Sequence, residues 1–412
     1  MLTKICESAK VAQRQLAVAS TAIKNSALEA IAKALVENSA YIIEQNKIDL
    51  ENAKGVIKDS MLDRLMLDEK RIKGIADAIS TVIALDDPVG KTEYGTVRPN
   101  GLEILKKKVP LGVIGIIFEA RPNVTVDAAV LCLKSGNAAV LRGGKEAIRS
   151  NLALAKIMRE AIASVGLLPD CINLIEDTSR ETSNAMMKAN GLIDVLIPRG
   201  GAGLIKSVVQ NATVPVIETG LGNCHIFIDE SADLKMASDI LYNAKCSRPS
   251  VCNAAETLLV HSAVAEKFLP MAYEKLAEKS VEIRGDEVVK KILGDVVAPA
   301  TEEDFATEFD DYIISIGVVD SLDEAIAHIR KYTTGHSEAI VTNSYENQKR
   351  FVEEIDAAAV YVNASTRFTD GGEFGLGAEI GISTQKLHTR GPMGLNDLTT
   401  VKYIVLGNGQ IR

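Results

Sequence analysis

The chain has 412 residues, 47% of them hydrophobic and 25% charged, which is typical of a soluble globular protein with two or three domains. Its net charge of −9 argues against DNA, RNA or an anionic membrane as the main partner, because those surfaces repel an acidic protein. No apolar run reaches the roughly 18 residues of a membrane span, and the N-terminal segment lacks a signal-peptide pattern, so we expect a cytoplasmic protein.

The cysteines and histidines predict a reduced protein without a metal site. The six cysteines contain no CxxC pair, and a chain of this length does not need a disulfide framework. The five histidines show no spacing typical of zinc ligands, so a structural zinc site is not expected.

Residues 1–85 predict several packed helices, because stretches such as LEAIAKALVENSAYIIEQN have helical periodicity. A hairpin is expected at 94–109, where an Asn-Gly turn joins two extended runs. Its second arm carries three consecutive lysines and looks too polar for a central strand. We expect this hairpin to form an arm that a partner subunit covers, with a solvated edge hairpin as the alternative.

Residues 109–219 alternate between apolar strands and helices. The expected strands are VPLGVIGIIFEA, AAVLRG, CINLIED, IDVLIP and TVPVIET, with a helix between each successive pair. This alternation predicts a parallel sheet covered on both faces, which binds ligands at the carboxyl ends of its strands.

A second α/β pattern covers residues 224–362, with the strands HIFIDE, ETLLVH, YIISIGVV, HSEAIVT and AAVYVNA. Ser321 and Glu324 predict a capping box before the helix EAIAHIRKY. The tail TTVKYIVLGNGQIR predicts a pair of strands around its Gly-Asn-Gly turn.

Two glycine-rich loops follow predicted strands. The first runs from Arg142 to Lys145 and opens a long helix, whose free N–H groups and flanking cations favour phosphate, including the 2′-phosphate of NADP. The second is IPRGGAG at 197–203. Neither has the GxGxxG or P-loop spacing, so each alone is more typical of an ordinary turn, but two on one sheet favour a nucleotide site.

Cys252, in the stretch SRPSVCNAAE, is the candidate nucleophile. It falls in a loop close to the cations Lys245 and Arg248, and a nearby cation favours the reactive thiolate. Cys132 lies in a predicted apolar helix, where a thiol is expected to be buried. Cys246 lies at the end of a predicted helix, where the helix dipole disfavours a thiolate. Cys171 is expected to be buried likewise. A plain packing role for Cys252 remains open on these residues alone.

Several segments in fixed order resemble the aldehyde dehydrogenase superfamily: PLGVIGII, SGNAAVLRGG, IPRGGAG, ETGLGN, the isolated Cys252 and EFGLGAEIG. FEARPNVT, RPSVCNAAETLLV and YVNASTRFTDGGEFGLGAEIGISTQKLHTRGPMG further resemble the branch that reduces L-glutamyl 5-phosphate with NADPH to the semialdehyde in proline biosynthesis. The likeness covers essentially the whole chain. It implies an α/β fold with a Rossmann-type cofactor domain, a second α/β catalytic domain and a small β arm.

The resemblance implies that Cys252 accepts the acyl group, releases phosphate and holds a thioester for reduction. Asn123 lies near the oxyanion asparagine of the superfamily, and the backbone N–H of Cys252 is a second donor. Glu218 matches the general-base position, although a reductase gains nothing from hydrolysis, so a structural carboxylate is an equal alternative. His225 is expected to be a packed strand residue.

For the cofactor, Arg142 and Lys145 stand where the superfamily has a lysine and an acid. A cation in place of the acid favours the 2′-phosphate of NADPH. Gly200 and Gly201 match the pyrophosphate loop, and Glu308 falls near the acid that holds the nicotinamide ribose.

Four further residues in family motifs are expected around the reactants. Phe374 is expected to wall the nicotinamide, with core packing as the alternative. Arg121, Arg248 and Arg367 are the candidates for binding the carboxylate and phosphate of the substrate, with a structural ion pair as the alternative for each.

The predicted domains are an NADPH-binding domain at 1–93 and 110–223, a catalytic domain at 224–362, a return segment at 363–398 and an oligomerisation arm at 94–109 and 399–412. A homo-oligomer is expected, and channelling from glutamate 5-kinase is a possible partnership. Two other classes stay open: a superfamily enzyme with another acyl or aldehyde substrate, and a non-catalytic protein that kept the fold.

Overall fold

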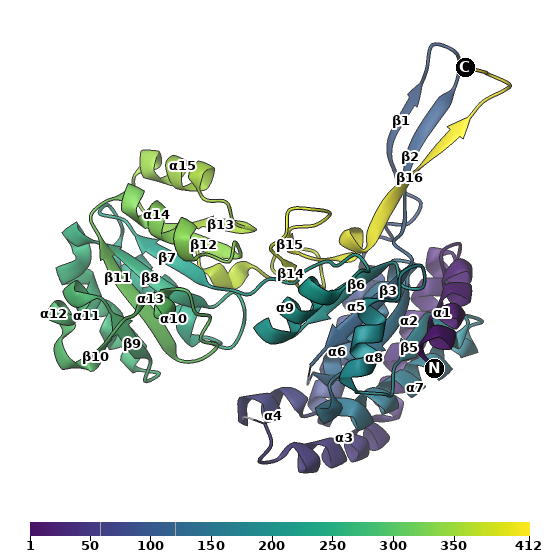
Figure 1. Ribbon diagram of the computed structural model, residues 1–412, viewed down its shortest axis with the longest axis horizontal. Coiled ribbons are helices and arrows are strands. Elements are labelled where there is room, and N and C mark those ends of the chain that lie inside the picture. Colours follow the sequence, from purple (N-terminus) through teal and green to yellow (C-terminus); the bar gives the residue numbers. More distant parts are fainter. Residues whose placement is uncertain (58, 120) are drawn as a thin grey trace. The chain divides into compact units, whose positions relative to one another are not determined.

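The computed structural model describes residues 1–57, 59–119 and 121–412, and it divides into two compact units (Figure 1). Unit 1 comprises 1–219, 375–381 and 393–412, and unit 2 comprises 220–374 and 382–392. The first boundary therefore lies four residues before the predicted start of the catalytic domain at 224. The predicted return segment is shared between the units, since its pieces pack alternately with one and the other.

The first part of unit 1 is helical, as predicted for residues 1–85. Its helices are α1 (Leu2–Leu16), α2 (Thr21–Glu37), α3 (Ser39–Ala53), α4 (Asp59–Leu65) and α5 (Glu69–Ala84). In the described part of the chain, no helix is long and apolar enough to cross a membrane.

The sheet of unit 1 has four parallel strands in the order β5-β4-β3-β6. The strands are β3 (Val113–Phe118), β4 (Ala138–Arg142), β5 (Ile172–Leu174) and β6 (Val195–Arg199). The helices that follow them are α6 (Pro122–Lys134), α7 (Ile148–Ser164), α8 (Arg180–Met187) and α9 (Ala202–Asn211). Ile114 and Ile116 point into one core and Val113 and Ile117 into another, so helices cover both faces, as predicted.

Two strand predictions in this unit are wrong. The segment 109–120 was predicted as one strand, but it is divided at Gly112, whose φ of +130° turns the chain between Pro110 and Val113. Its last residue, 120, lies outside the described residues. The segment 213–219 makes only one bridge, between Leu196 and Val216, because Pro215 has no N–H with which to extend the ladder.

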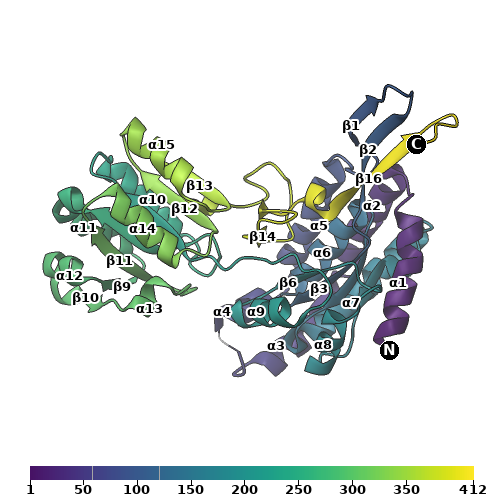
Figure 2. The same ribbon diagram turned by 45° about the horizontal axis from the view of Figure 1, so that its top comes forward.

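The arm is a three-stranded antiparallel sheet of β1 (Thr92–Val97), β2 (Glu103–Pro110) and β16 (Thr399–Leu406) (Figure 2). The predicted hairpin and its association with the tail are confirmed. Two details are wrong. The lysine-rich β2 is the central strand, which this solvated sheet allows, and Lys106 pairs with Glu93 at 3.1 Å. The tail contributes one strand, because β2 already supplies the partner of β16.

Unit 2 contains a seven-stranded parallel sheet in the order β10-β9-β11-β8-β7-β12-β13. The strands are β7 (Cys224–Ile228), β8 (Ala255–His261), β9 (Glu282–Gly285), β10 (Val297–Pro299), β11 (Ile313–Val319), β12 (Ser337–Val341) and β13 (Ala359–Val362). Its helices are α10 (Leu234–Cys246), α11 (Ser262–Ala277), α12 (Glu287–Leu293), α13 (Glu302–Phe305), α14 (Leu322–Tyr332) and α15 (Tyr345–Glu354). Alternate residues of β7 face two cores, Ile226 with α10 and α11, and Phe227 with α14 and α15.

The predicted strands of unit 2 are confirmed, and the segment from α11 to α13 adds elements that the sequence analysis did not predict. A short two-stranded sheet of β14 (Ile382–Ser383) and β15 (Gly391–Pro392) completes the unit. Ser321 caps α14 as predicted, but the Glu324 carboxylate accepts from the N–H of Asp320 instead of closing a capping box.

Candidate active site

Cys252 lies in the loop between α10 and β8, and it is the one cysteine of the six that is not buried. Burial raises the pKa of the Cys132 and Cys171 thiols to about 12 and that of Cys246 to about 11, which makes all three inert near neutral pH. Cys252 is therefore the cysteine that a reactant can reach.

The backbone of Cys252 is packed closely against the segment 222–224. A Cβ built on Gly222 would overlap the carbonyl group of Cys252, so only glycine fits there. The buried thiol of Cys224, at the start of β7, donates to the same carbonyl oxygen at 3.2 Å. Sequence reasoning missed both residues, although the ETGLGN motif contains Gly222.

Asn253, which follows the candidate nucleophile, ties this loop to residues 366–369. Its side-chain amide donates to the carbonyl oxygens of Thr369 at 2.9 Å and Arg367 at 3.2 Å, and its Oδ1 accepts from the Arg367 guanidinium. Its own carbonyl accepts from the Thr366 hydroxyl at 2.7 Å. Asn253 is buried, so these contacts fix the loop.

Two of the three predicted substrate arginines lie with Cys252. The half-buried Arg367 also donates from Nε to the Ser247 hydroxyl at 3.1 Å, and Arg248 is exposed in the same loop. Burial lowers the pKa of Arg367 and the nearby positive charge of Arg248 lowers it further, while Cys252 acts in the opposite direction. Arg121 instead begins α6 in unit 1, where its N–H donates to the Glu119 carbonyl at 2.6 Å.

Lys245 is not a cation available to the thiol, contrary to the sequence prediction. Its ammonium group is fully buried and bound to Glu256 at 2.6 Å. Glu308 lies beside this pair and accepts the N–H of Gly222 at 2.8 Å. Burial raises the pKa of Glu256 to about 8 and, with the repulsion of Asp310, that of Glu308 to about 7. The candidate ribose carboxylate thus contacts the loop that supports Cys252.

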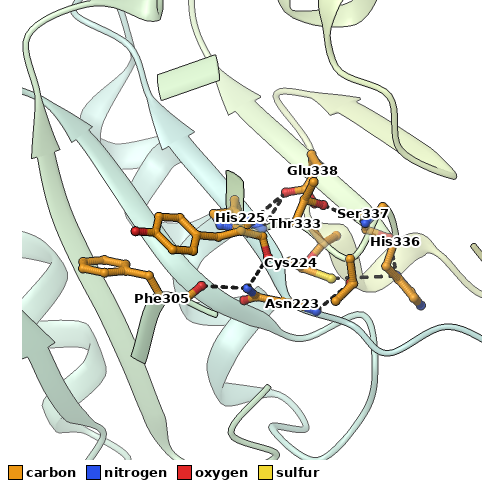
Figure 3. A network of polar contacts seen from close by, with 12 residues as sticks. Asn223, Cys224, His225, Phe305, Thr333, His336, Ser337 and Glu338 are labelled. Atoms are coloured by element: carbon orange, nitrogen blue, oxygen red, sulfur yellow. Dashed lines mark hydrogen bonds and ion pairs between the residues drawn. The ribbon is translucent and has the colours of Figure 1, made fainter. Parts of the chain in front are cut away.

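A buried polar network connects β7 with β12 and the segment before it (Figure 3). Glu338 accepts from the N–H of His225 at 2.8 Å, its carboxylate lies 3.0 Å from His225 Nδ1, and it also accepts from the Thr333 hydroxyl. The Asn223 amide donates to the carbonyl of Phe305 at 2.7 Å. His225 is fully buried in β7, so the prediction of a packed strand residue is confirmed.

In unit 1, the second glycine-rich loop lies at the N-terminus of α9. The N–H of Gly201 donates to the Glu119 carboxylate at 2.8 Å, and a Cβ on Gly200 would come within 2.5 Å of that carboxylate. The Glu119 carboxylate therefore already accepts the N–H of Gly201, and the lack of room for a Cβ applies to Gly200. Helix N-termini bind anions in this way, so a pyrophosphate takes this N–H only by displacing the Glu119 carboxylate.

The first glycine-rich loop ends in the exposed Lys145, which begins a 3-10 turn (Lys145–Ala147) before α7. The sequence analysis expected this loop to open the long helix directly, and that prediction is wrong, because the 3-10 turn lies between them. Arg142 is half-buried and donates to the carbonyl oxygens of Thr178 and Ser179. Lys145 is therefore available to a phosphate, whereas Arg142 already braces the loop before α8.

The remaining candidates are Asn123 and Glu218 in unit 1 and Phe374 in unit 2. Asn123 lies in the first turn of α6 and donates to Asp127 at 3.0 Å, and burial raises the pKa of that carboxyl to about 6. Phe374 is 45% exposed. Glu218 is half-buried, near the end of the first segment of unit 1.

The chain belongs to the aldehyde dehydrogenase family, whose family model matches residues 2–306. It is 61% identical over 408 residues to the γ-glutamyl phosphate reductase of Clostridium botulinum, with 98% of each chain covered, and 59% identical over 407 residues to that of Caldanaerobacter subterraneus, again with 98% of each covered. The crystal structure of the γ-glutamyl phosphate reductase from Thermotoga maritima superposes with a TM-score of 0.96 at 52% identity, covering 99% of both chains. Both the predicted fold class and the predicted family are confirmed.

Proposed function

We propose that this chain is an NADPH-dependent oxidoreductase that converts L-glutamyl 5-phosphate into L-glutamate 5-semialdehyde and phosphate, a step of proline biosynthesis. The observation that carries the proposal is the loop around Cys252. It combines the one accessible cysteine with Arg248 and Arg367, in a chain about 60% identical to proteins named for this reaction.

The chemistry proposed for Cys252 is nucleophilic catalysis. The thiolate attacks the acyl carbon, the S–C bond forms as the C–O bond to the phosphoryl group breaks, and the electron pair leaves on phosphate, which takes a proton from solvent. A bound nicotinamide cofactor would supply the hydride that reduces this thioester, after which the C–S bond of the hemithioacetal at Cys252 breaks to release the aldehyde and the thiolate. The backbone N–H of Cys252 and the amide of Asn123 are the proposed donors to the oxyanion.

The family uses a nicotinamide cofactor, and we propose NADPH as the form used here. We propose that Gly200 and Gly201 bind the pyrophosphate through their N–H groups, with the pyrophosphate displacing the Glu119 carboxylate from Gly201, and that the exposed Lys145 binds the 2′-phosphate. Arg142 supports this site through its contacts to the loop before α8. Glu308 is the proposed partner of the nicotinamide ribose, and Phe374 the proposed wall of the nicotinamide.

Arg121, Arg248 and Arg367 are the proposed ligands of the substrate's anionic groups. We further propose that the arm of β1, β2 and β16 holds a homo-oligomer together. A cytoplasmic location would keep Cys252 reduced. The labile acyl phosphate is proposed to be transferred from glutamate 5-kinase.

The direct test is a coupled assay with glutamate 5-kinase, ATP, glutamate and NADPH. We expect NADPH oxidation that depends on the kinase and releases one phosphate per NADPH oxidised. Replacing glutamyl phosphate by acyl-CoA substrates or simple aldehydes separates this activity from others in the family. Turnover with those substrates and none with glutamyl phosphate would refute the proposal.

A further inference from the structure

The two arginines beside Cys252 differ in how firmly they are held. Arg367 is bound at two points, by Asn253 Oδ1 and by the Ser247 hydroxyl. Arg248 is exposed and has no such anchor among the described residues. All four residues belong to, or contact, the loop that carries the thiol.

Neither arginine forms an ion pair with a carboxylate within the described residues. The groups that hold Arg367 are an amide oxygen and a hydroxyl, which orient its guanidinium without neutralising it. The positive charge of Arg248 acts against that of Arg367 more strongly than the carboxylate of Asp370 acts in its favour, so an anion bound by both guanidinium groups is favourable.

The proposed substrate carries two anionic groups, a phosphoryl group and an α-carboxylate, and their positions indicate which of them the two arginines bind. The phosphoryl group is bonded through oxygen to the carbon that the thiolate attacks, whereas the α-carboxylate is at the other end of the five-carbon chain. Cations on the nucleophile's own loop, such as Arg248, or bound to it, such as Arg367, are therefore within reach of the phosphoryl group during attack.

We propose that Arg248 and Arg367 bind the phosphoryl group of the substrate and the phosphate that leaves, and that Asn253 is the positioning residue that holds Arg367 for this purpose. The inference rests on the proposed function. Both guanidinium groups stabilise the negative charge that gathers on the leaving oxygen as the C–O bond breaks. The α-carboxylate is bound elsewhere.

The reverse reaction separates the two ends of the substrate, because phosphate and the semialdehyde are then independent reactants. In oxidation of L-glutamate 5-semialdehyde with NADP⁺ and inorganic phosphate, Arg367→Met should raise the KM for phosphate by about tenfold or more and leave the KM for the semialdehyde within about twofold. Arg330→Met is the matched control, since Arg330 is an exposed arginine of unit 2 that pairs with Glu354.

The positioning role of Asn253 is tested with a substitution of the same size. Asn253→Asp retains the acceptor for Arg367, loses the two amide donor bonds to the carbonyls of Arg367 and Thr369, and adds a negative charge that competes with phosphate. The KM for phosphate should therefore rise about tenfold with little change in the KM for NADP⁺, and the lost donor bonds should appear separately as a lower Tm. Ser247→Ala removes the second anchor of Arg367, together with the bond from the Ser247 hydroxyl to the carbonyl of Asn243, and should give a smaller rise in the KM for phosphate. The shift of Tm by inorganic phosphate alone should shrink in the same order.

The outcomes are distinguishable. If Arg367→Met and Asn253→Asp raise the KM for the semialdehyde and not that for phosphate, the arginines bind the carboxylate end and the inference is wrong. If the variants change neither value, or only lower Tm, a structural role replaces it. A wild-type protein without phosphate-dependent oxidation would instead remove the proposed function.

Discussion

At the scale of single residues, the site depends on how closely the chain packs around one thiol. Gly222 and Cys224 press against the carbonyl of Cys252, and Asn253 binds its neighbours through three side-chain hydrogen bonds. These contacts fix the backbone of Cys252, the proposed nucleophile, before any substrate binds.

Gly222→Ala should therefore damage catalysis more than folding. The added methyl group displaces the Cys252 backbone, and a displacement of this size is expected to lower kcat by about a hundredfold. Steady-state kinetics and thermal unfolding of the same preparation check this. Gly74→Ala is the control: it lies inside α5 with no atom near its Cβ, so it should keep full activity and add about 0.5–1 kcal/mol of stability.

Lys145→Glu should shift cofactor preference from NADPH towards NADH by about tenfold or more in the ratio of kcat/KM values, because a carboxylate repels the 2′-phosphate and accepts from a free hydroxyl. Kinetics with both cofactors measure the ratio. An unchanged ratio would remove Lys145 from the phosphate site and leave Arg142 as the remaining candidate.

Glu308→Gln should change how stability depends on pH. Because burial raises the folded-state pKa of Glu308 to about 7 from its ordinary 4.5, the folded chain binds more protons than the unfolded chain between these values. The stability that protonated Glu308 contributes is lost as pH rises through about 7. The free energy of unfolding of the variant relative to the wild type should thus increase between about pH 5 and 8.5, measured by denaturant titration. A constant difference would contradict the raised pKa.

At the scale of elements, the regular α/β units could be predicted because strand and helix periodicities persist over many residues in the segments that became β3, α6, β4 and α7. Periodicity did not predict where two of the strands end. Pro215 lacks the N–H that a longer strand needs, and the chain turns at Gly112. Cys252 could be predicted from its loop and its motif. Asn253 could not, because its partners lie more than a hundred positions away in the sequence.

The arm gives an element-scale prediction. Strand β16 pairs with β2 along its whole length, and an isolated two-stranded hairpin is marginal in water. Removing 399–412 should therefore unfold the arm and lower the mass in solution to that of a monomer, as measured by light scattering. Tyr403→Asp, which places a charge on an exposed face and keeps the strand, should weaken association in the same direction. A truncated chain with unchanged mass would assign the interface to another surface.

At the scale of the whole molecule, both units are built from discontinuous stretches of the chain, and residues 363–412 contribute to each unit in turn. The glycine-rich loops belong to unit 1, and Cys252 with its two arginines belongs to unit 2. The sequence predicted that the glycine-rich loops and Cys252 belong to different domains, but the alternation of residues 363–412 between units follows from packing that no local pattern records.

The central claim is a covalent bond between Cys252 and the acyl group. The most direct measurement is mass spectrometry of the protein quenched in acid after mixing with glutamyl phosphate, generated by glutamate 5-kinase, in the absence of NADPH. We expect a glutamyl thioester on the peptide that contains Cys252, absent from Cys252→Ala and discharged when NADPH is added before the quench. A wild-type protein that turns over glutamyl phosphate but never carries the adduct, or a Cys252→Ala variant that keeps more than a few per cent of the activity, would contradict it.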